Sequence, residues 1–101
     1  MPNETSDPQD IDFEDGKIYV LDSGTLKYYF FNGFVWDVGI ALPAGATSPK
    51  AIDVKNAGNL VSVLNGDGKI FTRRNNAWDN GTDGPTSMRN FTGFSVSEVL
   101  L

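Results

Sequence analysis

Two Trp-Asp pairs, each followed two residues later by glycine, divide this chain into two similar halves. Trp36-Asp37 with Gly39 recurs as Trp78-Asp79 with Gly81, at a spacing of 42 residues. Other residues recur in the same order at offsets of 41 to 44: Ile11-Asp12 as Ile52-Asp53, Val20-Leu21-Asp22 as Val63-Leu64-Asn65, and Gly24 as Gly68. A period of this length predicts one structural unit that occurs twice, with small insertions in its turns.

Within each unit, short apolar runs alternate with clusters of Asn, Asp and Gly. The apolar run 60–64 stops at Asn65-Gly66-Asp67-Gly68, and a second strand-like run, 69–74, follows. Asn, Asp and Gly readily adopt the positive φ angles of tight turns, so we expect a β-hairpin here. Asn32-Gly33 is the strongest short hairpin signal in the chain. No helix is expected. The predicted fold class is all-β, with four short antiparallel strands in each of two tandem units.

The predicted units are residues 11–45 and 46–84. Residues 1–10 form a polar arm with two prolines, and we expect another protein chain to hold this arm in place. Residues 85–101 end in an apolar, strand-like run. We interpret this C-terminal segment as a truncated third unit, whose strand pairs with a neighbouring unit or a neighbouring chain.

The residue types present exclude several classes of chemistry. The 101 residues include no cysteine and no histidine, which excludes disulfides, thiolate nucleophiles, histidine bases and Cys/His zinc sites. Most carboxylates lie in or beside turns, where Asp serves the backbone. We therefore predict that the protein is not an enzyme and has no catalytic residues, metal site or cofactor. The net charge of −5 argues against a nucleic-acid partner, since binding phosphates needs a basic patch.

The sequence also gives expectations about membranes and location. Residues 1–10 lack the apolar segment of a signal peptide, and no apolar run has the length needed to span a membrane. We therefore expect no membrane partner. The sequence does not determine the localisation, and a virion or a cytoplasmic assembly is the setting that we expect.

Residues 11–81 resemble the blades of a β-propeller. Units of about 40 to 45 residues, with four short strands and a closing Trp-Asp pair, are the pattern of that family. The similarity is closest to tectonin-like and other short-blade lectin propellers. The Gly-His pair of WD40 blades and the Gly-Gly doublet of kelch blades are missing. The resemblance implies two blades per chain. The alternative architecture is a single small β-sandwich or barrel built from two hairpin pairs.

Two blades cannot close a ring, so the resemblance implies a homo-oligomer. Propellers have roughly four to eight blades, which permits a dimer, trimer or tetramer, and a trimer is our first expectation. Successive side chains of a strand point to opposite faces, so the aromatic run 28–31 makes both faces of its strand apolar. The residues that we predict at the oligomer interface are Tyr28, Tyr29, Phe30, Phe31, Phe91 and Phe94.

Two functions remain open at this point. The first is a non-enzymatic, homo-oligomeric structural or assembly protein, such as a phage-like virion accessory or decoration component. The alternative is a small oligomeric lectin that binds carbohydrate through Trp36, Asp37, Trp78 and Asp79. An exposed indole can stack on a sugar while the aspartate accepts hydroxyl hydrogen bonds, and repeated sites would add avidity. Tryptophan also fills blade and subunit interfaces, and packing is our preferred interpretation of these residues.

Overall fold

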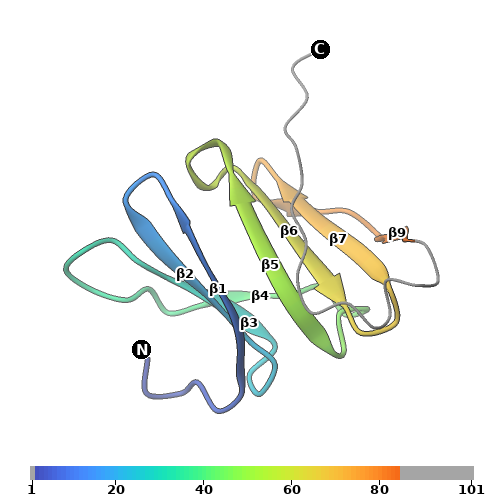
Figure 1. Ribbon diagram of the computed structural model, residues 1–101, viewed down its shortest axis with the longest axis horizontal. Helices are drawn as coiled ribbons and strands as arrows, with labels where there is room; N and C mark the ends of the chain where they lie inside the picture. Colours follow the sequence, from blue (N-terminus) through green and yellow to red (C-terminus); the bar gives the residue numbers. More distant parts are fainter. Residues whose placement is uncertain (1, 85–101) are drawn as a thin grey trace.

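The computed structural model describes residues 2–84, which form two antiparallel β-sheets (Figure 1). Sheet A is a meander of β1 (Pro8–Glu14), β2 (Lys17–Asp22), β3 (Lys27–Phe31) and β4 (Ile40–Ala41). Sheet B is a meander of β5 (Pro49–Lys55), β6 (Leu60–Asn65), β7 (Lys69–Arg74) and β8 (Ala77–Trp78), and β9 (Thr82–Asp83) also pairs with β7. Helix within the described residues amounts to one 3-10 turn, η1 (Asn56–Gly58). The predicted all-β class is confirmed.

Local turn chemistry explains where the chain reverses. Asp15-Gly16 joins β1 to β2, and Asn75-Asn76 joins β7 to β8. Both residues of each pair have positive φ, at 51° and 73° in the first turn and 52° and 68° in the second. Two consecutive positive φ angles match the type I′ turn, whose twist suits a two-residue hairpin loop.

Sheet B has five strands where the sequence predicted four, and the difference is small. After β7 the chain pairs back in two short pieces, β8 and β9, which are separated by the loop 79–81. In sheet A the second piece is β4, whereas the first is only an isolated bridge between Phe31 and Trp36. The extra strand therefore reflects one additional residue pair, Arg74 with Ala77, at the tip of sheet B.

The start of β1 lies inside the segment 1–10 that was expected to be an arm, and the chain itself holds it. The Asp22 carboxylate accepts hydrogen bonds from the amides of Asp7 (2.7 Å) and Ser6 (3.2 Å). Its other oxygen accepts from the hydroxyl and the amide of Thr25, at 2.7 and 2.9 Å. Burial alone would raise the pKa of Asp22, but these hydrogen bonds outweigh it and lower the pKa. Contact of the arm with another chain stays a prediction.

Alternation along the strands gives each sheet two faces, which we call front and back. The front face of sheet A carries Ile11, Phe13, Ile18, Val20, Tyr29 and Phe31, and its back face carries Asp10, Asp12, Tyr19, Leu21, Tyr28 and Phe30. The front face of sheet B carries Ile52, Val54, Val61, Val63, Phe71 and Arg73. The back of sheet A packs on the front of sheet B, and the buried cluster between them is Tyr19, Leu21, Tyr28, Ile52, Val54, Val61 and Val63.

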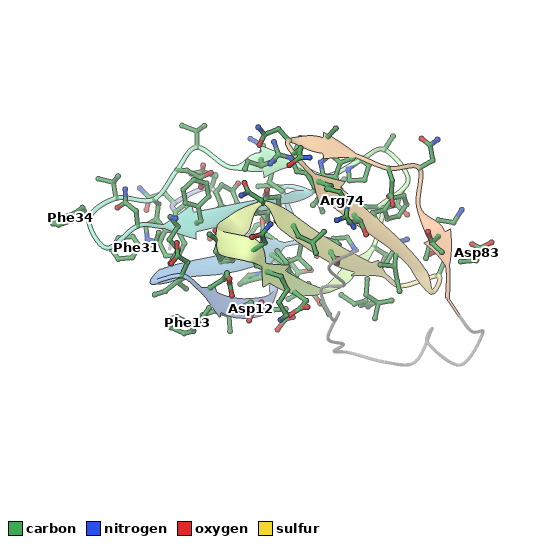
Figure 2. The ribbon with its side chains drawn as sticks, turned by 90° about the horizontal axis from the view of Figure 1, so that it is seen from above. Asp12, Phe13, Phe31, Phe34, Arg74 and Asp83 are labelled. Atoms are coloured by element: carbon green, nitrogen blue, oxygen red, sulfur yellow. The ribbon has the colours of Figure 1, made fainter. Side chains whose placement is uncertain are left out.

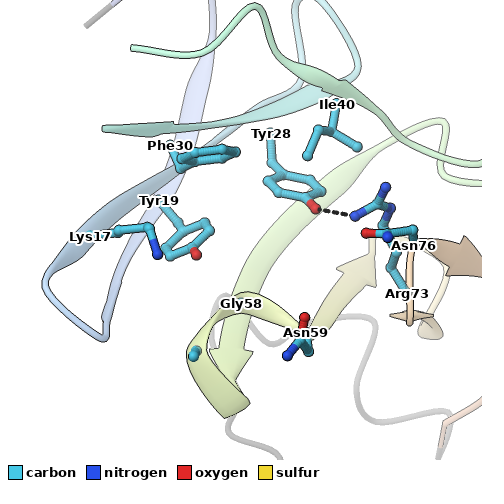
Figure 3. Close-up of a pocket in the computed structure, with 10 residues that line it drawn as sticks. Lys17, Tyr19, Tyr28, Phe30, Ile40, Gly58, Asn59, Arg73 and Asn76 are labelled. Carbon is cyan, nitrogen blue, oxygen red and sulfur yellow. Dashed lines mark hydrogen bonds between the residues drawn. The ribbon is translucent and has the colours of Figure 1, made fainter. Parts of the chain in front are cut away.

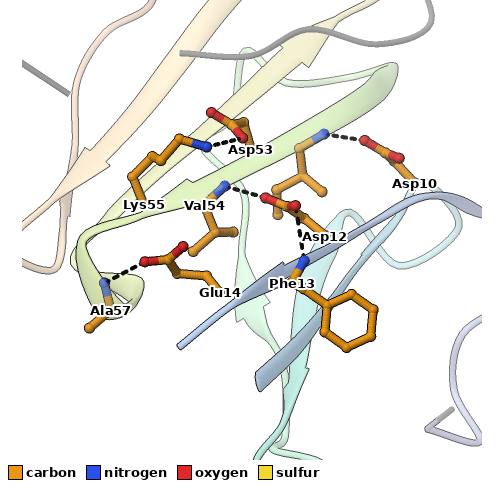
Figure 4. A network of polar contacts seen from close by, with 9 residues as sticks. Asp10, Asp12, Phe13, Glu14, Asp53, Val54, Lys55 and Ala57 are labelled. Atoms are coloured by element: carbon orange, nitrogen blue, oxygen red, sulfur yellow. Dashed lines mark hydrogen bonds and ion pairs between the residues drawn. The ribbon is translucent and has the colours of Figure 1, made fainter. Parts of the chain in front are cut away.

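Two aspartates connect the edge strands of the two sheets, β1 and β5 (Figure 4). The Asp10 carboxylate accepts from its neighbour's amide, Ile11 N, at 2.8 Å and from Ile52 N of β5 at 2.9 Å. Asp12 repeats the arrangement one step along, accepting from Phe13 N at 2.9 Å and Val54 N at 2.7 Å. Unpaired edge amides are costly to bury and prone to aggregation when exposed. The carboxylates of Asp10 and Asp12 accept hydrogen bonds from the edge amides of β5 and fix the alignment of β1 with β5.

Candidate functional site

The front face of sheet A is an apolar surface that no described element covers completely. Ile11 and Phe13 of β1 have exposed fractions of 58% and 67%. Phe31 of β3 is half-buried, and its ring packs against that of Trp36 at a centroid distance of 5.2 Å. Figure 2 shows Phe13, Phe31 and Phe34 at the same end of the molecule. Large exposed apolar side chains gathered in one place mark interaction sites in soluble proteins.

The matching face of sheet B is buried, and the strand pairing shows which residues correspond. Ile11 and Phe13 pair with Val20 and Ile18 in sheet A, as Ile52 and Val54 pair with Val63 and Val61 in sheet B. Ile52 and Val54 have exposed fractions of 3% and 0%, because the back of sheet A covers them. The two sheets thus present similar apolar front faces, but only sheet A leaves the residues of its edge strand exposed, while Val20 and Tyr29 of the same face are buried.

The loop between β3 and β4 extends this surface with a fixed tip. The Asn32 side chain accepts hydrogen bonds from the amides of Phe34 (2.9 Å) and Val35 (3.1 Å). The Asn32 amide in turn donates to the Val35 carbonyl, at 3.3 Å. Gly33 supplies the φ of +104° that the tip requires. This turn presents Phe34 with an exposed fraction of 90%, so an ordered backbone holds the side chain in solvent.

The structure places Asp37 and Asp79, two of the predicted carbohydrate-binding residues, in equivalent backbone contacts. The Asp37 carboxylate accepts from Phe30 N at 2.8 Å, and Asp79 accepts from Thr72 N at 3.0 Å. Asp79 also accepts from Gly81 N at 3.0 Å. Burial raises the pKa of Asp37, and the backbone hydrogen bonds offset part of that effect. Each carboxylate thus links the segment that follows the third strand of its sheet to a backbone amide of that strand.

The two tryptophans occupy corresponding positions with different surroundings. Trp78 packs edge-on against Tyr28 at a centroid distance of 6.2 Å, and its indole N–H donates to the Ala41 carbonyl at 3.0 Å. It therefore connects sheet B to the back of sheet A. Trp36 is half-buried beside Phe31 on the uncovered front of sheet A. Carbohydrate binding by Trp36, Asp37, Trp78 and Asp79 stays a prediction, and Trp78 already has a packing role.

The predicted interface residues divide into three groups. Tyr28 and Tyr29 are buried within the chain. Phe30 and Phe31 are half-buried and point to opposite faces. The remaining two, Phe91 and Phe94, lie in the predicted segment 85–101, outside the described residues. Ile11, Phe13 and Phe34 were not predicted. The strict alternation of 11–14 and its alignment with residues 52–55 are the signals that could have identified Ile11 and Phe13.

Comparisons with known proteins do not assign this chain to a family: no protein-family model, curated protein or solved structure was found to match it. Within residues 2–84, no group of three or more acidic side chains is placed to hold a metal ion. No helix in this part of the chain is long and apolar enough to cross a membrane.

Proposed function

We propose that this protein is a non-enzymatic structural protein that assembles with copies of itself through the front face of sheet A. The observation that supports the proposal is the front-to-back packing of the two sheets. The front of sheet B is buried by the back of sheet A. The front of sheet A buries Val20 and Tyr29 but exposes Ile11 and Phe13 of β1, and Phe34 is exposed in the adjoining loop. A second copy that covers this face would bury Ile11, Phe13 and Phe34, as the back of sheet A buries Ile52 and Val54.

The propeller-like repeat predicts a head-to-tail contact, in which different faces of the two copies meet. A heterologous contact of this kind generates a ring when its rotation closes, and a filament when it does not. A ring of two-sheet chains corresponds to the propeller-like arrangement that the repeat predicts, with a trimer as the first expectation. Burying one Phe side chain contributes roughly 1.5–3 kcal/mol, so covering Phe13 and Phe34 supplies a substantial part of the association free energy. A virion or other surface-assembly role for such an oligomer rests on the sequence alone.

Sedimentation equilibrium of the full chain tests this proposal. We expect a stable oligomer, trimeric in the first instance, and we expect the double variant Phe13→Ser with Phe34→Ser to sediment as a monomer of unchanged secondary structure. Leu26→Asn is the matched control. It removes another exposed apolar side chain, in the turn between β2 and β3 at the opposite end of sheet A, and its φ of 56° suits Asn. A wild-type chain that is monomeric at every concentration would overturn the proposal.

A further inference from the structure

A cavity of about 280 Å³ opens between the two sheets, away from the front face of sheet A (Figure 3). One wall comes from the back of sheet A, with Lys17, Tyr19, Tyr28, Phe30 and Ile40. The other wall comes from η1 and the residue that follows it, from β7 and from the β7–β8 turn, with Ala57, Gly58, Asn59, Arg73 and Asn76. Its volume lies just below the range of roughly 300–1,000 Å³ in which proteins bind drug-sized ligands, so it suits a ligand of about one ring.

The polar groups of this cavity are mainly hydrogen-bond donors, and two of them are cationic. Arg73 donates to the Tyr28 hydroxyl at 3.2 Å through one of its nitrogens, which leaves its other N–H groups for a ligand. Within residues 2–84 the Lys17 ammonium has neither an ion-pair nor a hydrogen-bond partner. None of the ten lining residues is acidic; the nearby Glu14 carboxylate accepts from Ala57 N at 3.1 Å. In a chain with 13 acidic and 8 basic residues, such a lining favours an anionic ligand.

The Tyr19 hydroxyl adds a further donor beside an aromatic wall. Burial first, and then the neighbouring Tyr28 and the carboxylates Glu14, Asp15 and Asp37, raise the pKa of Tyr19, so its hydroxyl stays protonated. Gly58 lies close to this hydroxyl: a Cβ atom at position 58 would be 2.5 Å from the Tyr19 oxygen. Tyr19 and Phe30 have ring centroids 5.8 Å apart, and they give the wall an apolar part on which a flat or ring-shaped molecule can rest.

We propose that this cavity binds an acidic monosaccharide, a sugar ring that carries a carboxylate. Arg73 and Lys17 bind the carboxylate, the amides of Asn59 and Asn76 and the Tyr19 hydroxyl bind ring hydroxyls, and the aromatic wall contacts the ring. The site differs from the Trp-Asp positions, and it lies within one chain. It therefore does not depend on the oligomer proposed above, and either proposal can fail without the other.

Titration of the ¹⁵N-labelled full chain with glucuronate, glucose and acetate, followed by amide chemical shifts, tests the proposal. We expect glucuronate to saturate shifts around residues 58–59 and 73–76 with a millimolar dissociation constant. Glucose and acetate should each bind at least about tenfold more weakly, because each lacks one of the two recognised features. Absence of saturable glucuronate binding, or equal binding of either other probe, would overturn the proposal.

Variants that each remove one positive charge locate the site. Arg73→Gln and Lys17→Gln should each weaken glucuronate binding about tenfold, since a hydrogen bond to a charged group is lost. Arg74→Gln is the matched control, because Arg74 is exposed on the same strand and does not line the cavity. Arg73→Gln also removes the hydrogen bond to Tyr28. If that variant unfolds at a lower temperature than the wild type, the test of the site rests on Lys17→Gln. Equal binding by Lys17→Gln and Arg74→Gln contradicts the assignment.

Discussion

The front faces of the two sheets have similar residues and opposite environments. Ile52 and Val54 of sheet B are buried beneath Tyr19, Leu21 and Tyr28 of sheet A, while their counterparts in β1 face solvent. Val20 and Tyr29 on the front of sheet A are also buried, and Gly39 lies close to the Tyr29 ring. The difference between the faces therefore lies at the edge strand, which is covered in sheet B and exposed in sheet A.

The two sheets also differ in the loop that follows their third strand. The loop 32–38 of sheet A carries Phe34, whereas Asn76 occupies the corresponding place in sheet B and lines the inter-sheet cavity. Phe31 likewise corresponds to Arg73, since each pairs with the tryptophan of its unit. At these two positions sheet A is thus more apolar than sheet B. This is the reverse of what solubility alone would favour, and it is what a face that binds another copy requires.

The largest expected effect comes from placing a charge on each face in turn. Val54→Asp buries an unpaired carboxylate next to Asp12, and we expect it to lower the free energy of unfolding by more than about 4 kcal/mol or to prevent folding. Phe13→Asp, at the matching but exposed position, should change the stability of the single chain by less than about 1 kcal/mol. Urea unfolding at low protein concentration measures both. Equal destabilisation would mean that the face of sheet A is covered as well.

A second, smaller effect tests whether the two units are equivalent where both are closely packed. Gly39 and Gly81 both have φ of +90°, and a Cβ would stand 2.5 Å from the Tyr29 ring at the first and 2.7 Å from the Phe71 ring at the second. Replacing either by Ala combines backbone strain with overpacking, and we expect a loss of roughly 2–4 kcal/mol in each case.

Gly16→Ala provides the control for these two variants. Gly16 has φ of +73° and nothing within 4 Å of an added Cβ. Its replacement by Ala therefore adds backbone strain but no overpacking, and should lower the free energy of unfolding by about 1 kcal/mol. Urea unfolding of the three variants separates the terms. A Gly39→Ala variant no less stable than Gly16→Ala would show that the Tyr29 ring moves aside without cost, and that the two units differ in this contact.

The strands and turns could be predicted from the sequence because they depend on neighbouring residues. Asp15-Gly16 and the cluster 65–68 mark reversals through φ preferences that act locally, and apolar runs between them have few alternatives to strands. The spacing of the Trp-Asp pairs indicated that both halves follow one plan. Asp37 and Asp79 accept hydrogen bonds from backbone amides 42 residues apart, and the repeat itself stays a prediction.

The candidate sites could not be predicted, because they depend on which elements meet. Asp10 and Asp12 looked like parts of a polar arm and a turn-rich segment, and their role at the edge of β5 depends on the contact between β1 and β5. The cavity around Arg73 forms only where sheet B meets the back of sheet A. The run 28–31 looks apolar on both faces in the sequence, so sequence alone does not tell which of its faces is covered by the second sheet.

The smallest expected effect concerns one position that differs in charge between the units, Asp22 in sheet A and Asn65 in sheet B. The Asn65 side-chain oxygen accepts a hydrogen bond from Ser48 N at 2.7 Å, as the Asp22 carboxylate does from Asp7 N. Only Asp22 has a second oxygen, which accepts hydrogen bonds from Thr25. Asp22→Asn should cost about 1–2 kcal/mol at pH 7, because the amide nitrogen cannot accept the Thr25 hydrogen bonds.

The pH dependence of that loss distinguishes a charge effect from a packing effect. The folded state lowers the pKa of Asp22 below its usual 3.8, so the stability from its carboxylate is present above that value and is lost as the pH falls through the folded-state pKa. The difference between the wild type and Asp22→Asn should therefore shrink in acid. Thermal unfolding between pH 7 and pH 2 measures it, and a constant difference would contradict the hydrogen-bonding explanation.

The reverse substitution is Asn65→Asp. The Asn65 amide nitrogen now donates to the Asp67 carboxylate at 3.0 Å, and the substitution would place a second carboxylate there. The loss of stability should therefore be greatest at pH 7 and should decline in acid.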